Sequence, residues 1–288
     1  DLLANEFELD DLLDWGFEPK ELDLDLWAGD PPEDVEPQID KAEELREKWG
    51  VELGQLWKLG EHRLICGDCT DKAVVERVMG GERADMIFTD PPYGIDLDTD
   101  WSKMTGPNTK IVRNINTFNK VIGDDKPFDP TFIFELFGYC DEIFMWGADY
   151  YYDKLPKGTF LVWDKRVTEE LDRMYGSHFE ILWSKNKHRK EIIRYIWAGF
   201  LGHNKTLDSD RKVHPTQKPV GLMIEILNKY SKDNWIVVDP FLGSGTTLIA
   251  CERLGRKCRA VEISPAYVAV AIQRWVDVTG KEPVLLSN

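Results

Sequence analysis

Short apolar runs alternate with amphipathic segments along most of this chain of 288 residues. Runs bounded by Gly, Pro and Asp suit buried strands, and the amphipathic segments between them suit helices. We predict strands at Leu56–Leu59, His62–Cys66, Met86–Thr89, Glu142–Trp146, Phe160–Asp164, His178–Trp183, Trp235–Asp239 and Lys257–Glu262. We predict helices at Ile39–Trp49, Lys72–Met79, Pro130–Tyr139, Pro219–Tyr230, Thr246–Leu254 and Pro265–Thr279.

This alternation predicts the fold class. Strands separated by helices form mostly parallel sheets, because the crossover helices cover both faces. The sequence therefore predicts an α/β fold with a doubly wound, mostly parallel sheet. A polar stretch at about 96–120 shows no sustained period, and we expect a long functional loop there.

Charge divides the chain into two parts. Residues 1–50 hold 18 acids and 4 bases, whereas residues 51–288 have a net charge of only −2. We therefore expect an acidic arm and linker at 1–50 and one large domain at 51–288. The stretch Trp183–Pro219 has a local charge of +6, so the total of −16 does not exclude nucleic acid. We expect a small recognition insert at about 185–213.

The five cysteines are sparse and odd in number, which favours a reducing compartment over a disulfide framework. Cys66 and Cys69 form a single C-x-x-C pair without two further ligands at matching spacing, so we expect no metal. No apolar run spans a bilayer and no signal-peptide pattern opens the chain, so we expect a cytoplasmic protein without a membrane partner. Because the chain begins at Asp1 rather than methionine, we expect a processed or truncated product.

The stretch DMIFTDPPYGID ends an apolar run with an acid, two prolines and an aromatic residue. Pro91 and Pro92 cannot donate to a strand ladder, so they end the run and stiffen the loop behind it. The loop would hold Asp90 and Tyr93 beyond the carboxyl end of a strand. Taken alone, a Pro-Pro pair indicates only a strand end and a turn.

The stretch VVDPFLGSGTTLIACERLG places a glycine-containing turn between a buried strand and a helix. It lacks the Gly-Lys-Ser/Thr ending of a P-loop, and Leu248 excludes the G-x-G-x-x-G dinucleotide pattern. By itself such a turn is also common without a ligand. Glu262, at the end of the next strand, is placed to accept hydrogen bonds from ribose hydroxyls. Together they favour a nucleoside-like ligand without a phosphate.

Two further stretches are weak on their own. HPTQKPVGLMIEIL brings polar donors directly before a helix, and a capped helix start with a solvated lysine explains it equally well. Gly67-Asp68-Cys69 follows a predicted strand, again beyond its carboxyl end.

In combination, DPPY, HPTQKP, DPFLGSGTT and a strand ending in Glu resemble the β-class DNA amino-methyltransferases, which use S-adenosylmethionine (SAM). The resemblance covers roughly residues 55–280. The DPPY block precedes the glycine turn, which implies the circularly permuted, Rossmann-like SAM methyltransferase fold. Residues before about 50 resemble the tail of the ParB-like domain of phage-type members.

The resemblance implies roles for single residues. Asp90 and the Pro91 carbonyl would accept the hydrogens of an exocyclic amine, Pro92 would keep the loop rigid, and Tyr93 would stack on a base swung out of the duplex. The residues implied for SAM are Asp68, Thr216, Lys218, Asp239, Phe241, Gly243, Gly245, Thr246 and Glu262, with Lys218 on the methionine carboxylate.

The implied substrate is double-stranded DNA, and DPPY rather than SPPY favours N6 of adenine, as in restriction-modification methyltransferases. The candidates for phosphate contact are Lys185, Lys187, Arg189, Lys190, Arg194, Lys205, Arg211 and Lys212. Methylation of cytosine N4, of RNA or of a protein glutamine, and a catalytically silent DNA-binding module, are the alternatives. A short insert is compatible with a short target sequence or a homodimer, whereas the recognition sequence and any partner endonuclease cannot be read from one chain.

Overall fold

The computed structural model describes residues 35–96, 122–166, 177–195 and 218–287. The N-terminal 34 residues, most of the polar loop and residues 196–217 lie outside this part. Predictions for Lys205, Arg211, Lys212 and Thr216 therefore fall outside the described residues.

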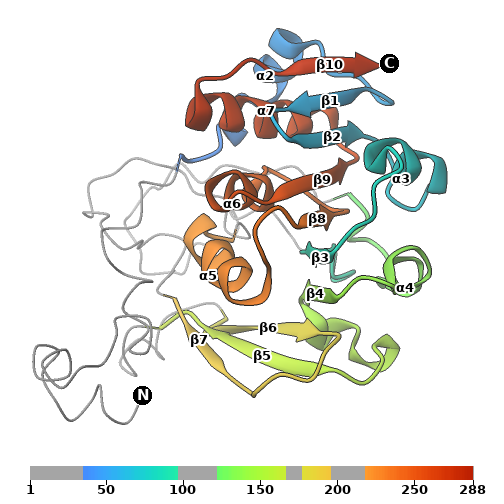
Figure 1. The fold of residues 1–288 in the computed structure, drawn as a ribbon, viewed down its shortest axis with the longest axis vertical. Coiled ribbons are helices and arrows are strands. Elements are labelled where there is room, and N and C mark those ends of the chain that lie inside the picture. The colour runs from blue at the N-terminus through green and yellow to red at the C-terminus, as the bar shows by residue number, and fades with distance from the viewer. Residues whose placement is uncertain (1–34, 97–121, 167–176, 196–217, 288) are drawn as a thin grey trace, which may run out of the picture. The chain divides into compact units, whose positions relative to one another are not determined.

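The described residues form one ten-stranded sheet in the order β10-β1-β2-β9-β8-β3-β4-β6-β5-β7 (Figure 1). The five central strands from β2 to β4 all run parallel, whereas β1, β10 and β6 are antiparallel to their neighbours. The strands are β1 (Leu56–Leu59), β2 (His62–Cys66), β3 (Met86–Thr89), β4 (Glu142–Trp146), β5 (Thr159–Asp164), β6 (Phe179–Ser184), β7 (Ile192–Arg194), β8 (Ile236–Asp239), β9 (Lys257–Glu262) and β10 (Val284–Ser287).

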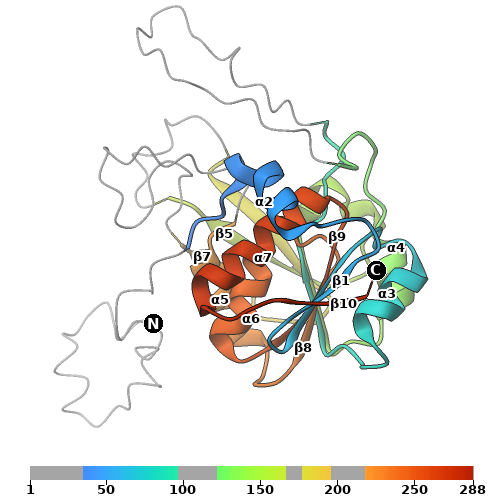
Figure 2. The ribbon, with the colours of Figure 1, turned by 90° about the horizontal axis from the view of Figure 1, so that it is seen from above.

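Helices lie on both faces of this sheet (Figure 2). One face carries α3 (Lys72–Met79) and α4 (Thr131–Phe137), and the other carries α2 (Ala42–Trp49), α5 (Val220–Tyr230), α6 (Thr246–Leu254) and α7 (Pro265–Thr279). Short 3-10 turns occupy Ile39–Lys41 (η3), Ala148–Tyr150 (η5) and Tyr152–Lys154 (η6). The predicted α/β fold with a mostly parallel, doubly covered sheet is confirmed.

Side-chain alternation along the strands explains the two layers. In β3, Met86 and Phe88 join the core beneath α5 and α6, while Ile87 joins the core beneath α3 and α4. All three side chains are fully buried. Because successive strand residues point to opposite faces, a run that is apolar at every position must be covered on both sides.

The chain order explains why distant motifs meet. Strands β8 and β9, from the C-terminal third, insert between β2 and β3. Their carboxyl ends therefore lie in one row with the carboxyl ends of β2, β3 and β4, and we call this row the carboxyl edge of the sheet. In an open parallel sheet, that edge is where ligands bind.

Most predicted elements have their predicted type, and eight match to the residue. Four others differ from the structure by one residue at one or both ends. Helix α4 is shorter than the predicted helix Pro130–Tyr139, and the predicted helix Ile39–Trp49 divides into η3 and α2. The sequence missed β7 and β10. Strand β7 is three residues long within the basic strip, and β10 is an exposed edge strand, so neither shows a buried apolar run.

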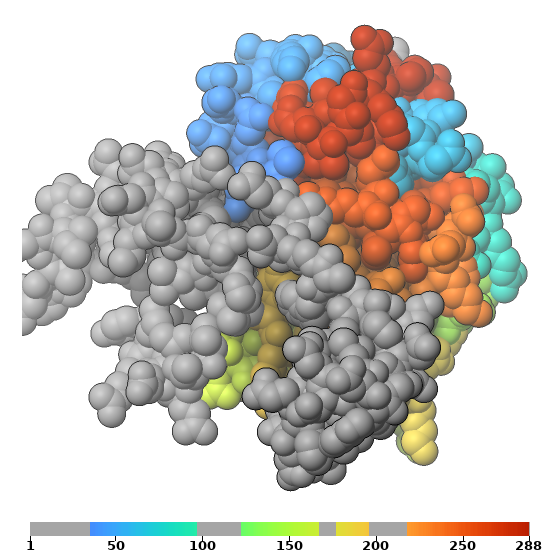
Figure 3. Space-filling view, turned by 60° about the vertical axis from the view of Figure 1, so that its left-hand side comes forward, coloured from blue at the N-terminus to red at the C-terminus, as the bar shows by residue number. Residues whose placement is uncertain are grey.

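Helix α2 packs against α7 and belongs to the compact unit that begins at Val35. Trp49 Nε1 and Lys48 Nζ both donate to Gln273 Oε1, at 3.2 and 2.7 Å. Figure 3 shows the blue residues of α2 beside the red residues of α7 on the surface. The helical part of the expected 1–50 arm thus contacts the large domain. Among the described residues, no helix is long and apolar enough to cross a membrane.

Glu252 of α6 ties together three elements of this layer. Its carboxylate accepts from His62 Nε2 at 2.8 Å, Trp275 Nε1 at 3.0 Å and Lys281 Nζ at 3.1 Å. The hydrogen bond from His62 is the main reason that the pKa of Glu252 falls to about 2. Because this pKa lies below the ordinary value of 4.5, the stabilisation is complete above pH 4.5 and is lost as the pH falls through about 2.

We expect Glu252→Ala to lower the free energy of unfolding at pH 7 by about 2 kcal/mol, because it leaves buried donors without an acceptor. Urea unfolding measures this loss. The control is Glu76→Ala, whose exposed pair with Lys72 spans 3.5 Å and should contribute less than about 0.5 kcal/mol. Equal losses in the two variants would contradict the role of Glu252.

Candidate functional site

Two loops form the candidate site, one after β3 and one after β8. The first contains Asp90, Pro91, Pro92 and Tyr93, and the second runs from Pro240 to Gly245. A hydrogen bond of 2.7 Å from Thr89 Oγ1 to Asp239 Oδ1 joins the ends of these strands. Both residues are nearly fully buried. The two motifs therefore sit side by side on the sheet edge.

The turn after β8 is built around Asp239. Asp239 Oδ1 also accepts from the Phe241 backbone N–H at 3.1 Å, so the carboxylate holds the start of the turn. Gly245 has a φ of +93°, and a Cβ there would lie 3.1 Å from the Cβ of Ala271 in α7. Only glycine suits both the backbone and this close helix approach.

Glu262 faces the same turn from the end of β9. Its Oε2 accepts from the Gly243 N–H and its Oε1 accepts from the Ser264 N–H, each at 2.8 Å. Each carboxylate oxygen has a second acceptor position. A Cβ on Gly243 would meet nothing within 4 Å, so open space lies over the turn. A nucleoside with ribose hydroxyls fits this acceptor and this open space.

Asp68 lies next to Glu262 on the same sheet edge. The Gly67 N–H donates to the Glu262 carbonyl at 3.0 Å, which fixes the loop after β2 against the end of β9. Asp68 Oδ1 accepts from the backbone N–H and the hydroxyl of Thr70, at 2.8 and 2.7 Å. The structure thus brings Asp68, Asp239, Glu262 and the glycine turn together.

Burial changes the acidity of the two inner carboxyl groups. It raises the pKa of Asp239 to about 6 and that of Glu262 to about 6. Both pKa values exceed the ordinary values of 3.8 and 4.5, so these groups stabilise the folded protein below about pH 4 and lose that contribution as the pH rises through 6. A ligand that donates hydrogen bonds to the charged carboxylates would restore part of this stability.

We therefore expect the affinity for SAM to increase as the pH rises from 5 to 7, with proton release on binding near pH 6. Isothermal titration calorimetry in buffers of different ionisation enthalpy measures both quantities. An affinity that stays constant or falls over this interval would contradict the acceptor role of these carboxyl groups.

The loop after β3 holds Asp90 by both oxygens. Tyr93 OH donates to Asp90 Oδ1 at 2.6 Å, and Lys218 Nζ donates to Asp90 Oδ2 at 2.7 Å. Pro91 is buried, so the loop cannot rotate freely. Burial and the neighbouring Asp90 raise the pKa of Tyr93 well above its ordinary value, which keeps this hydroxyl protonated as a donor.

Tyr93 is held on several sides. A Cβ on Gly147 would lie 2.0 Å from Cε1 of Tyr93, so the ring fits only against a glycine. The ring also stacks on Tyr150, with centroids 4.9 Å apart and planes inclined by 12°. Tyr150 is 52% exposed and was not predicted as a site residue. Its only sequence signal was a cluster of aromatic residues after a predicted strand.

Lys218 lies beside Asp90, at the start of α5. Besides Asp90, its ammonium contacts Glu180 Oε2 at 2.8 Å and Tyr93 OH at 3.2 Å. Its predicted pairing with a methionine carboxylate stays a prediction. Glu180, at the start of β6, is a site residue that sequence reasoning missed, because a single acid in an apolar strand carries no motif.

The basic strip divides between the two ends of the sheet. Ser184 of β6 pairs with Phe144 in the middle of its antiparallel neighbour β4, and the Lys185 N–H donates to the Ile143 carbonyl, so the residues that follow Ser184 lie at the amino end of the parallel strands. Arg194 of β7 pairs with Asp164, the last residue of β5, which lies at the carboxyl end of the parallel strands. Lys185, Lys187, Arg189 and Lys190 are therefore at the end away from Asp90, whereas Arg194 is at the carboxyl end.

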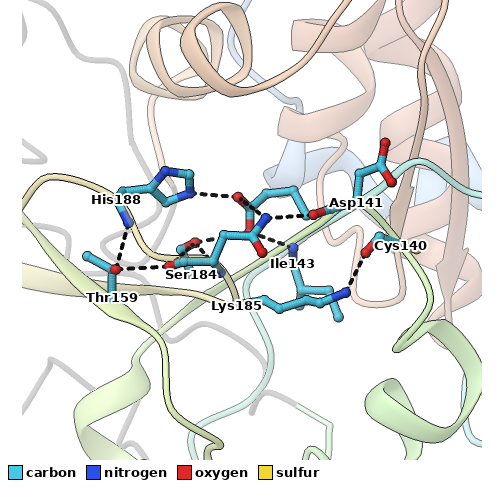
Figure 4. Close-up of polar contacts among 9 residues, drawn as sticks. Cys140, Asp141, Ile143, Thr159, Ser184, Lys185 and His188 are labelled. Carbon is cyan, nitrogen blue, oxygen red and sulfur yellow. Dashed lines mark hydrogen bonds and ion pairs between the residues drawn. The ribbon is translucent and has the colours of Figure 1, made fainter.

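A buried polar cluster fixes the start of this strip (Figure 4). Glu142 accepts from Ser184 Oγ at 3.0 Å, and from Asn186 Nδ2 and His188 Nε2 at 3.0 and 2.6 Å. Lys185 Nζ donates to the carbonyls of Gly138 and Cys140, at 2.8 and 2.5 Å. The predicted phosphate contact of Lys185 would compete with this structural role.

Comparisons with known proteins agree with the two motifs. Residues 147–273 match the DNA methylase family of N6 and N4 methyltransferases. The chain is 26% identical over 241 residues to the Type II methyltransferase M.HpaI of Haemophilus parainfluenzae, which covers 74% of each chain. It is also 26% identical over 252 residues to the Type II methyltransferase M.HinfI of Haemophilus influenzae, covering 75% of this chain and 68% of that protein. These matches support the interpretation of this chain as a DNA methyltransferase.

Solved structures similar to this chain include the M1.HpyAVI–SAM complex and the PvuII DNA methyltransferase. The M1.HpyAVI–SAM complex is 20% identical, with a TM-score of 0.43 and coverage of 73% of this chain and 97% of that one. The cytosine-N4-specific PvuII DNA methyltransferase is 14% identical, with a TM-score of 0.47 and coverage of 75% and 86%. The family match supports SAM as the cofactor.

Proposed function

We propose that this protein transfers the methyl group of SAM to the exocyclic N6 amino group of adenine in double-stranded DNA. The hydrogen bond between Thr89 and Asp239 carries this proposal, since it holds the amine-binding loop beside the cofactor turn. A methyl donor on that turn and an amine at Asp90 would therefore be neighbours. The motif order supports the circularly permuted β-class arrangement.

The cofactor residues fit a nucleoside with a charged amino-acid tail. Glu262 would accept from the ribose hydroxyls, Asp68 from the adenine amino group, and the free N–H groups at the start of α6 would face the ligand. Phe241, Gly243, Gly245 and Thr246 would line the turn. Bound SAM would supply an electrophilic methyl group on its sulfonium.

The chemical problem is that an exocyclic amine delocalises its lone pair into the base. Asp90 and the Pro91 carbonyl would accept the two amine hydrogens and so free the lone pair for attack. After transfer, the nitrogen must release one proton, and Asp90 is the charged acceptor beside it. The raised pKa of Lys218 keeps that ammonium protonated, so it does not act as the base.

The target base needs a flat surface next to Asp90. Tyr93 would provide one, and stacking on an aromatic side chain contributes about 1–3 kcal/mol per base. Because Tyr150 stacks on Tyr93, a base that binds there must displace Tyr150 or stack from another side. Among the described residues of the basic strip, Arg194 at the carboxyl end of β7 is the one at the same end of the sheet as Asp90, so it is our candidate for a phosphate contact near this base.

Nucleoside analysis after incubation with tritiated SAM and duplex DNA tests the proposed specificity. We expect the label in N6-methyl-2′-deoxyadenosine. Label in N4-methylcytosine would replace the N6 assignment by the alternative while retaining amino methylation. Equal label on single-stranded DNA or RNA would contradict the preference for duplex DNA.

A further inference from the structure

The Lys218 ammonium is enclosed by three partners of this chain. It lies 2.7 Å from Asp90 Oδ2, 2.8 Å from Glu180 Oε2 and 3.2 Å from Tyr93 OH. Its side chain is only 5% exposed. Two of its three N–H donors form hydrogen bonds, to Asp90 and Tyr93, and Glu180 is an ion-pair partner at 2.8 Å. Lys218 is thus directed at the loop that would hold the target amine.

Burial alone would lower the pKa of Lys218, but Asp90 and Glu180 offset it and hold that pKa above its ordinary value. The lysine is therefore charged, and two carboxylates share it. Without Glu180, the buried cation would have Asp90 as its one charged partner and the neutral Tyr93 hydroxyl as its other contact. Glu180 provides the second fixed position for the ammonium.

Glu180 is itself held in place from the other side. Lys165, at the end of β5, forms an ion pair with Glu180 Oε1, and Lys218 contacts Oε2. Burial would raise the pKa of Glu180, yet Lys218 and Lys165 hold it below its ordinary value. The four groups form a chain of alternating charge in the order Asp90, Lys218, Glu180 and Lys165. Such a chain fixes geometry because each charge has a partner on both sides except at the ends.

We propose that Glu180 is a positioning residue for methyl transfer: it holds the Lys218 ammonium so that Asp90 keeps one orientation toward the target amine. This inference rests on the proposed function. It assigns a role to a residue that touches neither the cofactor turn nor Asp90 directly. This network would support the loop that holds the target base, whereas Glu262 supports the turn that would hold the cofactor.

The test is Glu180→Gln, which preserves size and removes the charge. We expect kcat to fall about 100-fold, as misplacement of a reacting group does, while the SAM dissociation constant and the KM for DNA stay within about 3-fold. The matched control is Glu191→Gln, which removes an acid that pairs at 2.6 Å with the exposed Lys229 outside this network. That control should retain kcat within about 2-fold.

A double-mutant cycle shows whether Glu180 acts through Lys218. We expect the double variant Glu180→Gln with Lys218→Met to have the same kcat as Lys218→Met alone, because Glu180 has no effect once the ammonium is gone. Thermal unfolding of all three variants identifies any loss that comes from misfolding.

Three results would overturn the inference while the wild-type enzyme methylates DNA. They are a wild-type kcat in Glu180→Gln, losses that multiply in the double variant, and a loss of SAM affinity as large as the loss of kcat. A wild-type protein that binds SAM but transfers no methyl group to DNA would instead overturn the proposed function, and this inference with it.

Discussion

Replacing Asp90 with alanine should lower methyl transfer to DNA by about 100- to 1,000-fold and leave SAM binding within about 3-fold. The carboxylate accepts from Tyr93 OH and Lys218 Nζ, and it would also accept an amine hydrogen of the target base. Its removal takes away the charged acceptor and releases both partners. The cofactor turn has its own support from Asp239 and Glu262, so it should persist.

Transfer of tritium from SAM to DNA measures the first quantity, and calorimetry measures the second. Asp153→Ala serves as a control, because Asp153 is exposed on η6 and should have no effect on either. Full transfer activity in Asp90→Ala would refute the amine-clamp mechanism. A parallel loss of SAM binding would show that the two loops do not act as separate halves.

Replacing Glu262 with alanine should weaken SAM binding by roughly 100-fold, as expected when hydrogen bonds to a charged acceptor are lost. Glu262 also accepts from the backbone of Gly243 and Ser264, so its removal loosens the turn that would surround the nucleoside. Transfer should fall with occupancy and recover in part at high SAM concentration. Asp90→Ala, by contrast, should lower methyl transfer while leaving the affinity for SAM nearly unchanged.

Calorimetric titration with SAM checks this expectation, with Glu282→Ala as the control. Glu282 is exposed beyond the end of α7 and far in sequence from the turn. An unchanged SAM affinity in Glu262→Ala would contradict the assignment of the cofactor site. The pH dependence of the wild-type affinity should also weaken in this variant, because one of the two groups with a pKa of about 6 is gone.

Local sequence patterns predicted the central sheet well because most residues of its strands are apolar and buried. Met86–Thr89 is buried at every position, so its run of apolar residues marks the strand and the polar residues that follow mark the sheet edge. The motifs at Asp90, Asp239 and Glu262 follow such ends directly. Their meeting at one edge follows from parallel pairing, which needs no knowledge of side-chain contacts.

The parts that sequence reasoning missed depend on long-range contacts. Glu180 is a lone acid in β6, and only the antiparallel pairing of β6 beside β4 brings it near Lys218. The basic strip appeared as one surface because its residues are close in sequence. The reversal of the chain between β6 and β7 places Lys185 and Arg194 at opposite ends of the sheet. No local pattern encodes either arrangement.

The most direct test of the account follows a methyl group from SAM to DNA in wild-type protein and in Asp90→Ala, with SAM binding measured on the same samples. We expect both proteins to bind SAM, and only the wild-type protein to label an exocyclic amino nitrogen of the DNA. Wild-type protein that binds SAM without labelling DNA, or label that persists in Asp90→Ala, would contradict it.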